Sequence, residues 1–98
     1  MTRDEALQVL RDHKPELEAQ GVIHAALFGS LARGEATAQS DIDVFVDIDP
    51  ARRIGVWGLT GIALFIQDLF PQRVDVAERR ALRDYVRPSA ERDAIFAF

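Results

Sequence analysis

Residues 41–48, Asp-Ile-Asp-Val-Phe-Val-Asp-Ile, alternate acidic and apolar side chains with a period of two. This pattern constrains the fold of the 98-residue chain more than any other. Consecutive side chains of a β-strand point to opposite faces of a sheet, so the pattern predicts a strand with one buried face. Asp41 and Asp43 are two residues apart and therefore project side by side from the other face. Asp49 and Pro50 end the strand.

Two further strands are predicted on either side of this one. Val22–Phe28 is short, mostly apolar and bounded by glycines, which is typical of a buried strand. Residues 73–77 form a third strand in which Asp75 lies between two valines. If this third strand pairs beside the second, Asp75 joins Asp41 and Asp43 on one face of the sheet.

Helices are predicted before and between the strands. Thr2 and Glu5 have the spacing of a capping box at the start of a first helix, which Pro15 should interrupt. Residues 57–70 carry apolar side chains on most positions, which predicts a well-buried helix ended by Pro71, with Trp57, Phe65 and Phe70 in the core.

Shorter helical segments are predicted at residues 31–33 and 79–86, with Pro88 separating the second from a tail over Ser89–Phe98. The apolar end of that tail, residues 95–98, either folds back onto the domain or forms a docking surface. The order of elements predicts an α/β (α+β) fold, a small mixed sheet of about three to four strands packed against helices. A single domain over residues 1–98 is expected from the length.

Composition and charge exclude several function classes. Hydrophobic residues make up 48% and charged residues 29% of the chain, as in ordinary globular proteins. The net charge of −4 argues against nonspecific nucleic-acid binding, which requires positive charge, so nucleic acid is not expected as the primary partner. The absence of cysteine excludes disulfides and thiolate metal ligands. No segment resembles a secretory signal or a membrane span, which predicts a cytoplasmic protein without a membrane partner.

Close carboxylates repel each other and are usually held ionised by a cation. Hard oxygen ligands suit Mg²⁺, which binds through one or two carboxylates together with substrate phosphates. With Asp75 beside Asp41 and Asp43, the site has the donors for two metal ions, an arrangement suited to in-line displacement at phosphorus.

Gly29-Ser30 directly follows the first predicted strand. A glycine at a strand end lets a phosphate approach the backbone, and the serine hydroxyl adds a donor. Arg33, one turn further on, is placed to supply positive charge to a triphosphate.

Gly29-Ser30, followed after ten residues by Asp41-x-Asp43, resembles the signature of the DNA-polymerase-beta-like nucleotidyltransferase superfamily. The stretch from Phe28 to Val46 is similar to its minimal nucleotidyltransferase branch. Further positions that match the family pattern are Arg33, Gly34, Ser40 and Asp75.

The resemblance implies a polymerase-beta-like fold and transfer of a nucleoside monophosphate to a hydroxyl, with pyrophosphate as the leaving group. Mg²⁺, as two ions, and ATP are the implied cofactor and co-substrate. The implied nucleotide-binding residues are Gly29, Ser30, Arg33 and Ser40. The implied catalytic and metal-binding residues are Asp41, Asp43 and Asp75.

The chain resembles the stand-alone cores of this branch that are encoded as antitoxins beside a HEPN-domain toxin, in the MntA–HepT type of toxin–antitoxin system. That resemblance implies AMP transfer (AMPylation) to a tyrosine of the partner toxin. Two alternatives stay open: an antitoxin that acts by binding alone, and an enzyme whose acceptor is a small molecule or an RNA end. The nucleotide, the acceptor hydroxyl and the oligomeric state are undetermined by the sequence.

Structural explanations compete at several positions. Ser30 alone is often a helix cap, Asp43 alone fits a solvated strand face, and Asp75 alone fits an exposed edge strand. Arg33 alone is an ordinary surface residue, as are the four arginines between residues 79 and 87. The combination of these positions, rather than any one of them, favours a catalytic site.

Overall fold

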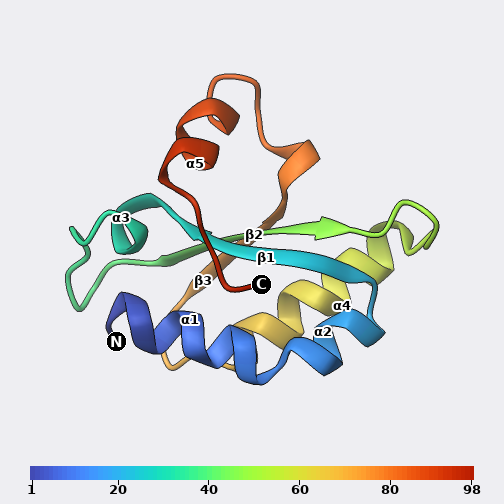
Figure 1. Cartoon of the computed structure of the whole chain (residues 1–98), viewed down its shortest axis with the longest axis horizontal. Coiled ribbons are helices and arrows are strands. Elements are labelled where there is room, and N and C mark those ends of the chain that lie inside the picture. The colour runs from blue at the N-terminus through green and yellow to red at the C-terminus, as the bar shows by residue number, and fades with distance from the viewer.

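The computed structural model describes residues 1–98 as a four-stranded mixed sheet with strand order β3-β2-β1-β4, flanked by helices (Figure 1). The strands are β1 (Val22–Phe28), β2 (Ile42–Ile48), β3 (Val74–Glu78) and β4 (Ile95–Phe96). The helices are α1 (Arg3–Asp12), α2 (Lys14–Ala19), α3 (Gly29–Ala32), α4 (Gly55–Asp68), the 3₁₀ turn η1 (Arg79–Ala81) and α5 (Arg87–Asp93). β1 is antiparallel to β2 and β4, whereas β3 is parallel to β2. The predicted fold class is confirmed.

The N-terminal helices follow local sequence rules. The Glu5 amide donates to Thr2 Oγ1 at 3.1 Å and the Thr2 amide donates to Glu5 Oε1 at 2.8 Å, which completes the predicted capping box. The helical run is interrupted at His13, and Pro15 lies in the first turn of α2, where its missing N–H costs no hydrogen bond. Gly21, with φ of 103°, makes the turn into β1.

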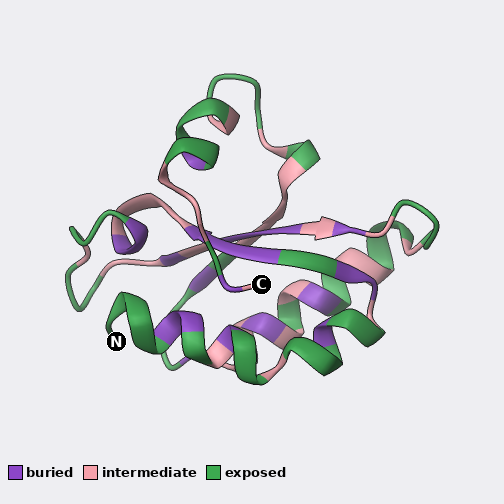
Figure 2. Ribbon diagram, viewed as in Figure 1, coloured by how far each residue is buried: buried purple, intermediate pink, exposed green.

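The larger core lies between one face of the sheet and the layer formed by α1, α2 and α4. Figure 2 shows buried inner faces and exposed outer faces on these three helices. The large, fully buried side chains of this core include Leu10, Leu17, Leu27, Ile42, Val44, Val46, Ile62 and Ile66. Burial of each such side chain stabilises the folded state by roughly 1.5–3 kcal/mol.

The opposite face of the sheet is only partly covered. η1 and α5 arch over it (Figure 1), and a small cluster of Ala26, Phe45 and Ala90 packs beneath them. Asp43, Phe45 and Asp47 of β2 alternate with the core residues and therefore point to this face. We call it the acidic face of the sheet.

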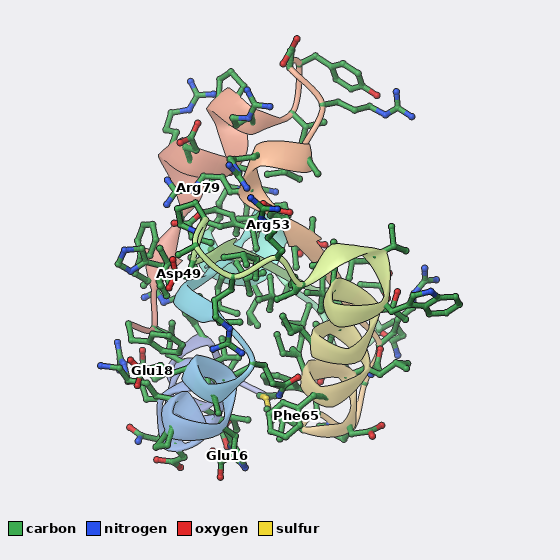
Figure 3. The ribbon with its side chains drawn as sticks, turned by 90° about the vertical axis from the view of Figure 1, so that its right-hand side faces the viewer. Glu16, Glu18, Asp49, Arg53, Phe65 and Arg79 are labelled. Atoms are coloured by element: carbon green, nitrogen blue, oxygen red, sulfur yellow. The ribbon has the colours of Figure 1, made fainter.

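The burial predicted for the long helix is wrong at Trp57, whose side chain is 86% exposed. α4 covers a sheet on one side only, so a single stripe that includes Ile62 and Ile66 is buried. Phe70 is buried as predicted. Phe65 is half-buried between α4 and the N-terminal helices (Figure 3), with its ring against His13.

The C-terminal region also differs from the prediction. Residues 79–86 form only the η1 turn and an irregular segment, because the chain is extended at Leu82. Pro88 does not separate a tail from a helix: it lies in the first turn of α5, a position that tolerates proline. The tail folds back, since Ile95 and Phe96 pair with β1 as an extra strand.

None of the five α-helices combines the length and the apolar character that a bilayer span requires.

Candidate active site

The candidate site lies on one row of the sheet. β1 and β2 pair Phe28 with Asp43, and β2 and β3 pair Asp43 with Asp75. Asp43 and Asp75 are thus neighbours on the acidic face, directly beside the end of β1, where Gly29 begins α3. Asp41 directly precedes β2 at the same end of the strand. The structure therefore brings the three predicted carboxylates to one corner of the acidic face.

Gly29 is required at its position by two independent features. Its φ is +71°, a conformation that side-chain-bearing residues rarely adopt. A Cβ atom added there would lie 2.2 Å from Asp43 Oδ2, which is too close for any side chain. The end of β1 and the Asp43 carboxylate therefore pack directly against each other because residue 29 has no side chain.

Ser30 lies within the first turn of α3 and is half-buried. Its hydroxyl makes no hydrogen bond, and α3 has no side-chain cap, so Ser30 does not act as a helix cap. α3 has only four residues, so its helix dipole is small. The free hydroxyl beside Gly29 is the polar group that this turn contributes.

Asp43 is the carboxylate with the most unusual environment. Partial burial, followed by the negative charges of Asp75 and Asp41, raises the pKa of Asp43 above its ordinary value, while Arg33 acts in the opposite direction. No cation forms an ion pair with Asp43. A half-buried, unpaired carboxylate flanked by two others is an arrangement that a bound cation would stabilise.

Arg73 is a site residue that the sequence analysis missed. Its Nε lies 3.9 Å from Asp41 Oδ2 and its guanidinium lies 3.3 Å from Asp75 Oδ1. The only available signal was its position as the first residue of the strand predicted to carry Asp75. An arginine at a strand start is common on protein surfaces, so that signal was too weak to use.

Arg33 and Ser40 have other contacts than the sequence suggested. The Arg33 guanidinium pairs with Glu35 at 2.7 Å and with Asp93 of α5 at 2.8 Å. The Ser40 hydroxyl accepts a hydrogen bond from the Thr37 amide at 2.9 Å and so closes the loop before β2. Both residues organise the segments around the carboxylates, and nucleotide contact by either one stays a prediction.

The donor set fits a hard divalent cation, with one restriction. Asp43 and its neighbours offer carboxylate oxygens, and Mg²⁺ needs only one or two of them when substrate phosphates supply the remainder. However, no three acidic or histidine side chains in the chain form a group that can hold a metal ion. Arg73 lies near both Asp41 and Asp75 and supplies positive charge at this corner.

The rest of the acidic face is closed by ion pairs. Arg79 binds the Asp47 carboxylate through two nitrogens and reaches Glu91 of α5 at 3.2 Å. Its guanidinium also stacks over Phe45, with a distance of 4.9 Å to the ring centroid. Figure 3 shows Arg79 at the base of the C-terminal segment, next to the sheet. Arg79 therefore fastens α5 to the sheet, and the unpaired carboxylate lies at the other end of β2.

The accessible carboxylates are not in a deep pocket. None of the four surface cavities of the protein is lined by Asp41, Asp43 or Asp75. The side chains of Asp41 and Asp75 are 43% and 51% exposed, so the corner is open to solvent.

Comparison with known proteins identifies the class to which this fold and site belong. Residues 6–97 match the family model described as a nucleotidyltransferase domain. The chain belongs to the nucleotidyltransferase domain family.

Within that family the chain is similar to small, single-core members. It is 37% identical to MJ0126 of Methanocaldococcus jannaschii, provisionally named a protein adenylyltransferase, over 97% of each chain. It is 31% identical to protein adenylyltransferase MntA of Thermococcus cleftensis, over 98% of this chain and 96% of that one.

Solved structures agree with this placement. A structure described, again provisionally, as a minimal nucleotidyltransferase superposes with a TM-score of 0.74 at 31% identity, covering 97% of this chain and 95% of the other. A toxin–antitoxin crystal structure with AMP-PNP shares the fold, with a TM-score of 0.68 at 19% identity, over 100% of this chain and 73% of the other. The resemblance to minimal nucleotidyltransferases, inferred from Phe28–Val46, is confirmed.

Proposed function

We propose that this chain is an Mg²⁺-dependent protein adenylyltransferase, with a single domain over residues 1–98, that transfers AMP from ATP to a tyrosine hydroxyl of a partner HEPN toxin and so neutralises it. The observation that carries the proposal is the packing of the Gly29 backbone at the end of β1 directly against Asp43, whose register partner on β3 is Asp75. We place the reaction in the cytoplasm.

In this proposal the protein positions the reactants and neutralises their charge. The Gly29 backbone and the Ser30 hydroxyl hold the triphosphate, because residue 29 has no side chain and the Ser30 hydroxyl has no hydrogen-bond partner within the protein. Asp41 and Asp43 are the ligands of the metal, which supplies charge neutralisation for the phosphates and the departing pyrophosphate. Asp75, paired beside Asp43, orients the attacking hydroxyl and accepts its proton.

The bond changes are those of a single in-line displacement. The acceptor oxygen forms a bond to the α-phosphorus, and the bond from the α-phosphorus to the oxygen that bridges to the β-phosphorus breaks. The hydroxyl proton passes to Asp75 and then to solvent, and pyrophosphate leaves. The rate gain comes from positioning and electrostatic stabilisation of the transferring group.

A protein acceptor is supported by the names of relatives and by the shape of the site. The relatives named as adenylyltransferases of proteins match the chain over nearly its whole length, and a protein of the same fold occurs in a toxin–antitoxin structure with an ATP analogue. The carboxylates lie on an open corner rather than in a pocket for a small molecule.

The test uses the purified chain, Mg²⁺ and α-labelled ATP, with the protein encoded beside it as acceptor. We expect label on the partner, one pyrophosphate released for each AMP transferred, and a tyrosine as the modified residue by peptide mass spectrometry. Omission of Mg²⁺ should stop the transfer. Label on a nucleic acid or small molecule instead of the partner would contradict the protein acceptor while leaving the chemistry in place.

A second candidate function is neutralisation by binding alone. The apolar tail that first suggested it folds back as β4, but α4 exposes Val56, Trp57 and Leu64 to solvent. Such a stripe suits a partner helix. Rescue of toxin-treated cells by an Asp41→Asn/Asp43→Asn variant at equal expression would favour binding, and failure of rescue would favour catalysis.

A further inference from the structure

Arg73 is the one cation that faces the outer carboxylates of the site. Its backbone carbonyl accepts the Ile42 amide at 2.9 Å, which fixes it beside the start of β2. Its guanidinium lies 3.9 Å from Asp41 and 3.3 Å from Asp75, and its side chain is 73% exposed. It makes no other ion pair.

These contacts are loose in comparison with those of the other arginines around the site. Charge-assisted hydrogen bonds between an arginine and a carboxylate are usually about 2.7–2.9 Å long. Arg33 has contacts in that range, at 2.7 and 2.8 Å, with Glu35 and Asp93. Arg73 has none, and exposed pairs of this kind contribute only about 0–1 kcal/mol, so they exchange readily for stronger partners.

We propose that Arg73 is a positioning residue that serves as the counter-ion of Asp41 and Asp75 before the nucleotide binds, and that moves to the phosphates when the metal-bound nucleotide arrives. The inference rests on the proposed function, because it assumes that a metal-bound triphosphate is the ligand of this corner.

Two physical arguments support the exchange. A divalent cation attracts the carboxylates more strongly than a single exposed guanidinium does, so its arrival displaces Arg73. The planar guanidinium then has a better partner close by, because its paired N–H groups match the oxygens of a phosphate. The side chain needs no new space for this movement, since it is already largely in solvent.

The consequence is a preferred order of binding. While Arg73 lies beside both Asp41 and Asp75, its positive charge opposes the approach of a free cation to these two carboxylates. Free Mg²⁺ therefore binds weakly, and the metal enters together with the nucleotide. Arg73 therefore weakens the binding of free Mg²⁺ and strengthens the binding of the nucleotide. These two opposite effects can be measured separately.

The experiment measures two affinities by titration calorimetry on the full chain: that for Mg²⁺ alone, and that for a non-hydrolysable ATP analogue in saturating Mg²⁺. For Arg73→Ala we expect Mg²⁺ alone to bind roughly threefold tighter or more, and the analogue to bind roughly tenfold weaker. Arg73→Lys keeps the charge but not the planar fork, so it should restore the weak binding of Mg²⁺ and recover only part of the analogue affinity.

Arg83→Ala is the matched control, because Arg83 is exposed and has no ion pair, and both affinities should equal those of the wild type. Equal analogue affinity in Arg73→Ala and wild type would overturn the proposal, as would a loss of both affinities together. Failure of the wild-type chain to bind the analogue would overturn the proposed function as well, so the two failures are distinguishable.

Discussion

At the scale of single residues, Asp43 has the environment that a site needs and a stable surface does not. It is half-buried and unpaired, whereas Asp47, four residues further along the same strand and on the same face, is bound by Arg79. Ionised Asp43 therefore lowers the stability of the folded state as long as no cation is bound.

This cost predicts a pH-dependent stability difference between wild type and Asp43→Asn. The pKa of Asp43 is raised in the folded state, so its protonation stabilises the fold below its ordinary pKa, and that contribution is lost as the pH rises through the raised value. Without metal, Asp43→Asn should be more stable than wild type at neutral pH, and the difference should shrink at acidic pH. Urea unfolding at both pH values tests this, and an equally stable or less stable variant at neutral pH would contradict it.

Gly29→Ala should remove activity through geometry rather than through loss of a functional group. The new Cβ meets Asp43 Oδ2 at 2.2 Å and must displace that carboxylate. A displacement of about 1 Å in a catalytic group is sufficient to lower the transfer rate roughly 100-fold.

Gly34→Ala is the control for the backbone cost of that substitution. Gly34 also has a positive φ, of +76°, but its added Cβ meets nothing within 4 Å. Both variants should lose about 1–2 kcal/mol of stability from the left-handed conformation, and only Gly29→Ala should lose transfer. Equal activity of the two variants would show that contact with Asp43 is unimportant.

The sequence predicts some of these residues and misses others for a physical reason. Asp41, Asp43 and Asp75 are placed by the period-two geometry of strands, which is local. Arg33 pairs with Asp93, sixty residues away, and Arg73 reaches Asp41, which lies 32 residues earlier in the chain. Contacts of that kind depend on the completed fold, so no local pattern reveals them.

At the scale of elements, α4 shows that an apolar residue of a helix is not always buried. Ile66 is fully buried against the sheet, whereas Trp57 on the outer face is 86% exposed. Ile66→Ala should therefore cost about 2–5 kcal/mol of stability, and Trp57→Ala should change it by less than about 0.5 kcal/mol. Thermal unfolding of the two variants tests the orientation of the helix, and a large loss in Trp57→Ala alone would show that the orientation is wrong.

The strands are easier to predict than the helices. β1 has the predicted bounds, and β2 and β3 differ from the prediction by one residue at their ends. The burial of α4 and the conformation of residues 79–98 are different, because both depend on what covers each face of the sheet. β4 has two residues and forms only because Leu27 and Ala26 leave an open edge for it.

At the scale of the whole molecule, the two faces of the sheet differ: one is packed against helices to form the larger core, and the other is the acidic face. α1, α2 and α4 pack on one side and bury the larger core. On the other side, α5 is held by Arg79, through Glu91, and by Arg33, through Asp93. This division allows a chain of 98 residues to carry both a core and an open corner with three carboxylates.

The central claim is that the corner around Asp43 performs the transfer, and the transfer rate of Asp43→Asn tests it most directly. Label from α-labelled ATP on the partner protein would be followed for wild type, for Asp43→Asn, and for Asp68→Asn as a matched control at an exposed aspartate without an ion pair. We predict a loss of at least about 100-fold in Asp43→Asn, with Asp68→Asn equal to wild type and all three chains folded by circular dichroism. Transfer by folded Asp43→Asn at the wild-type rate would contradict the account.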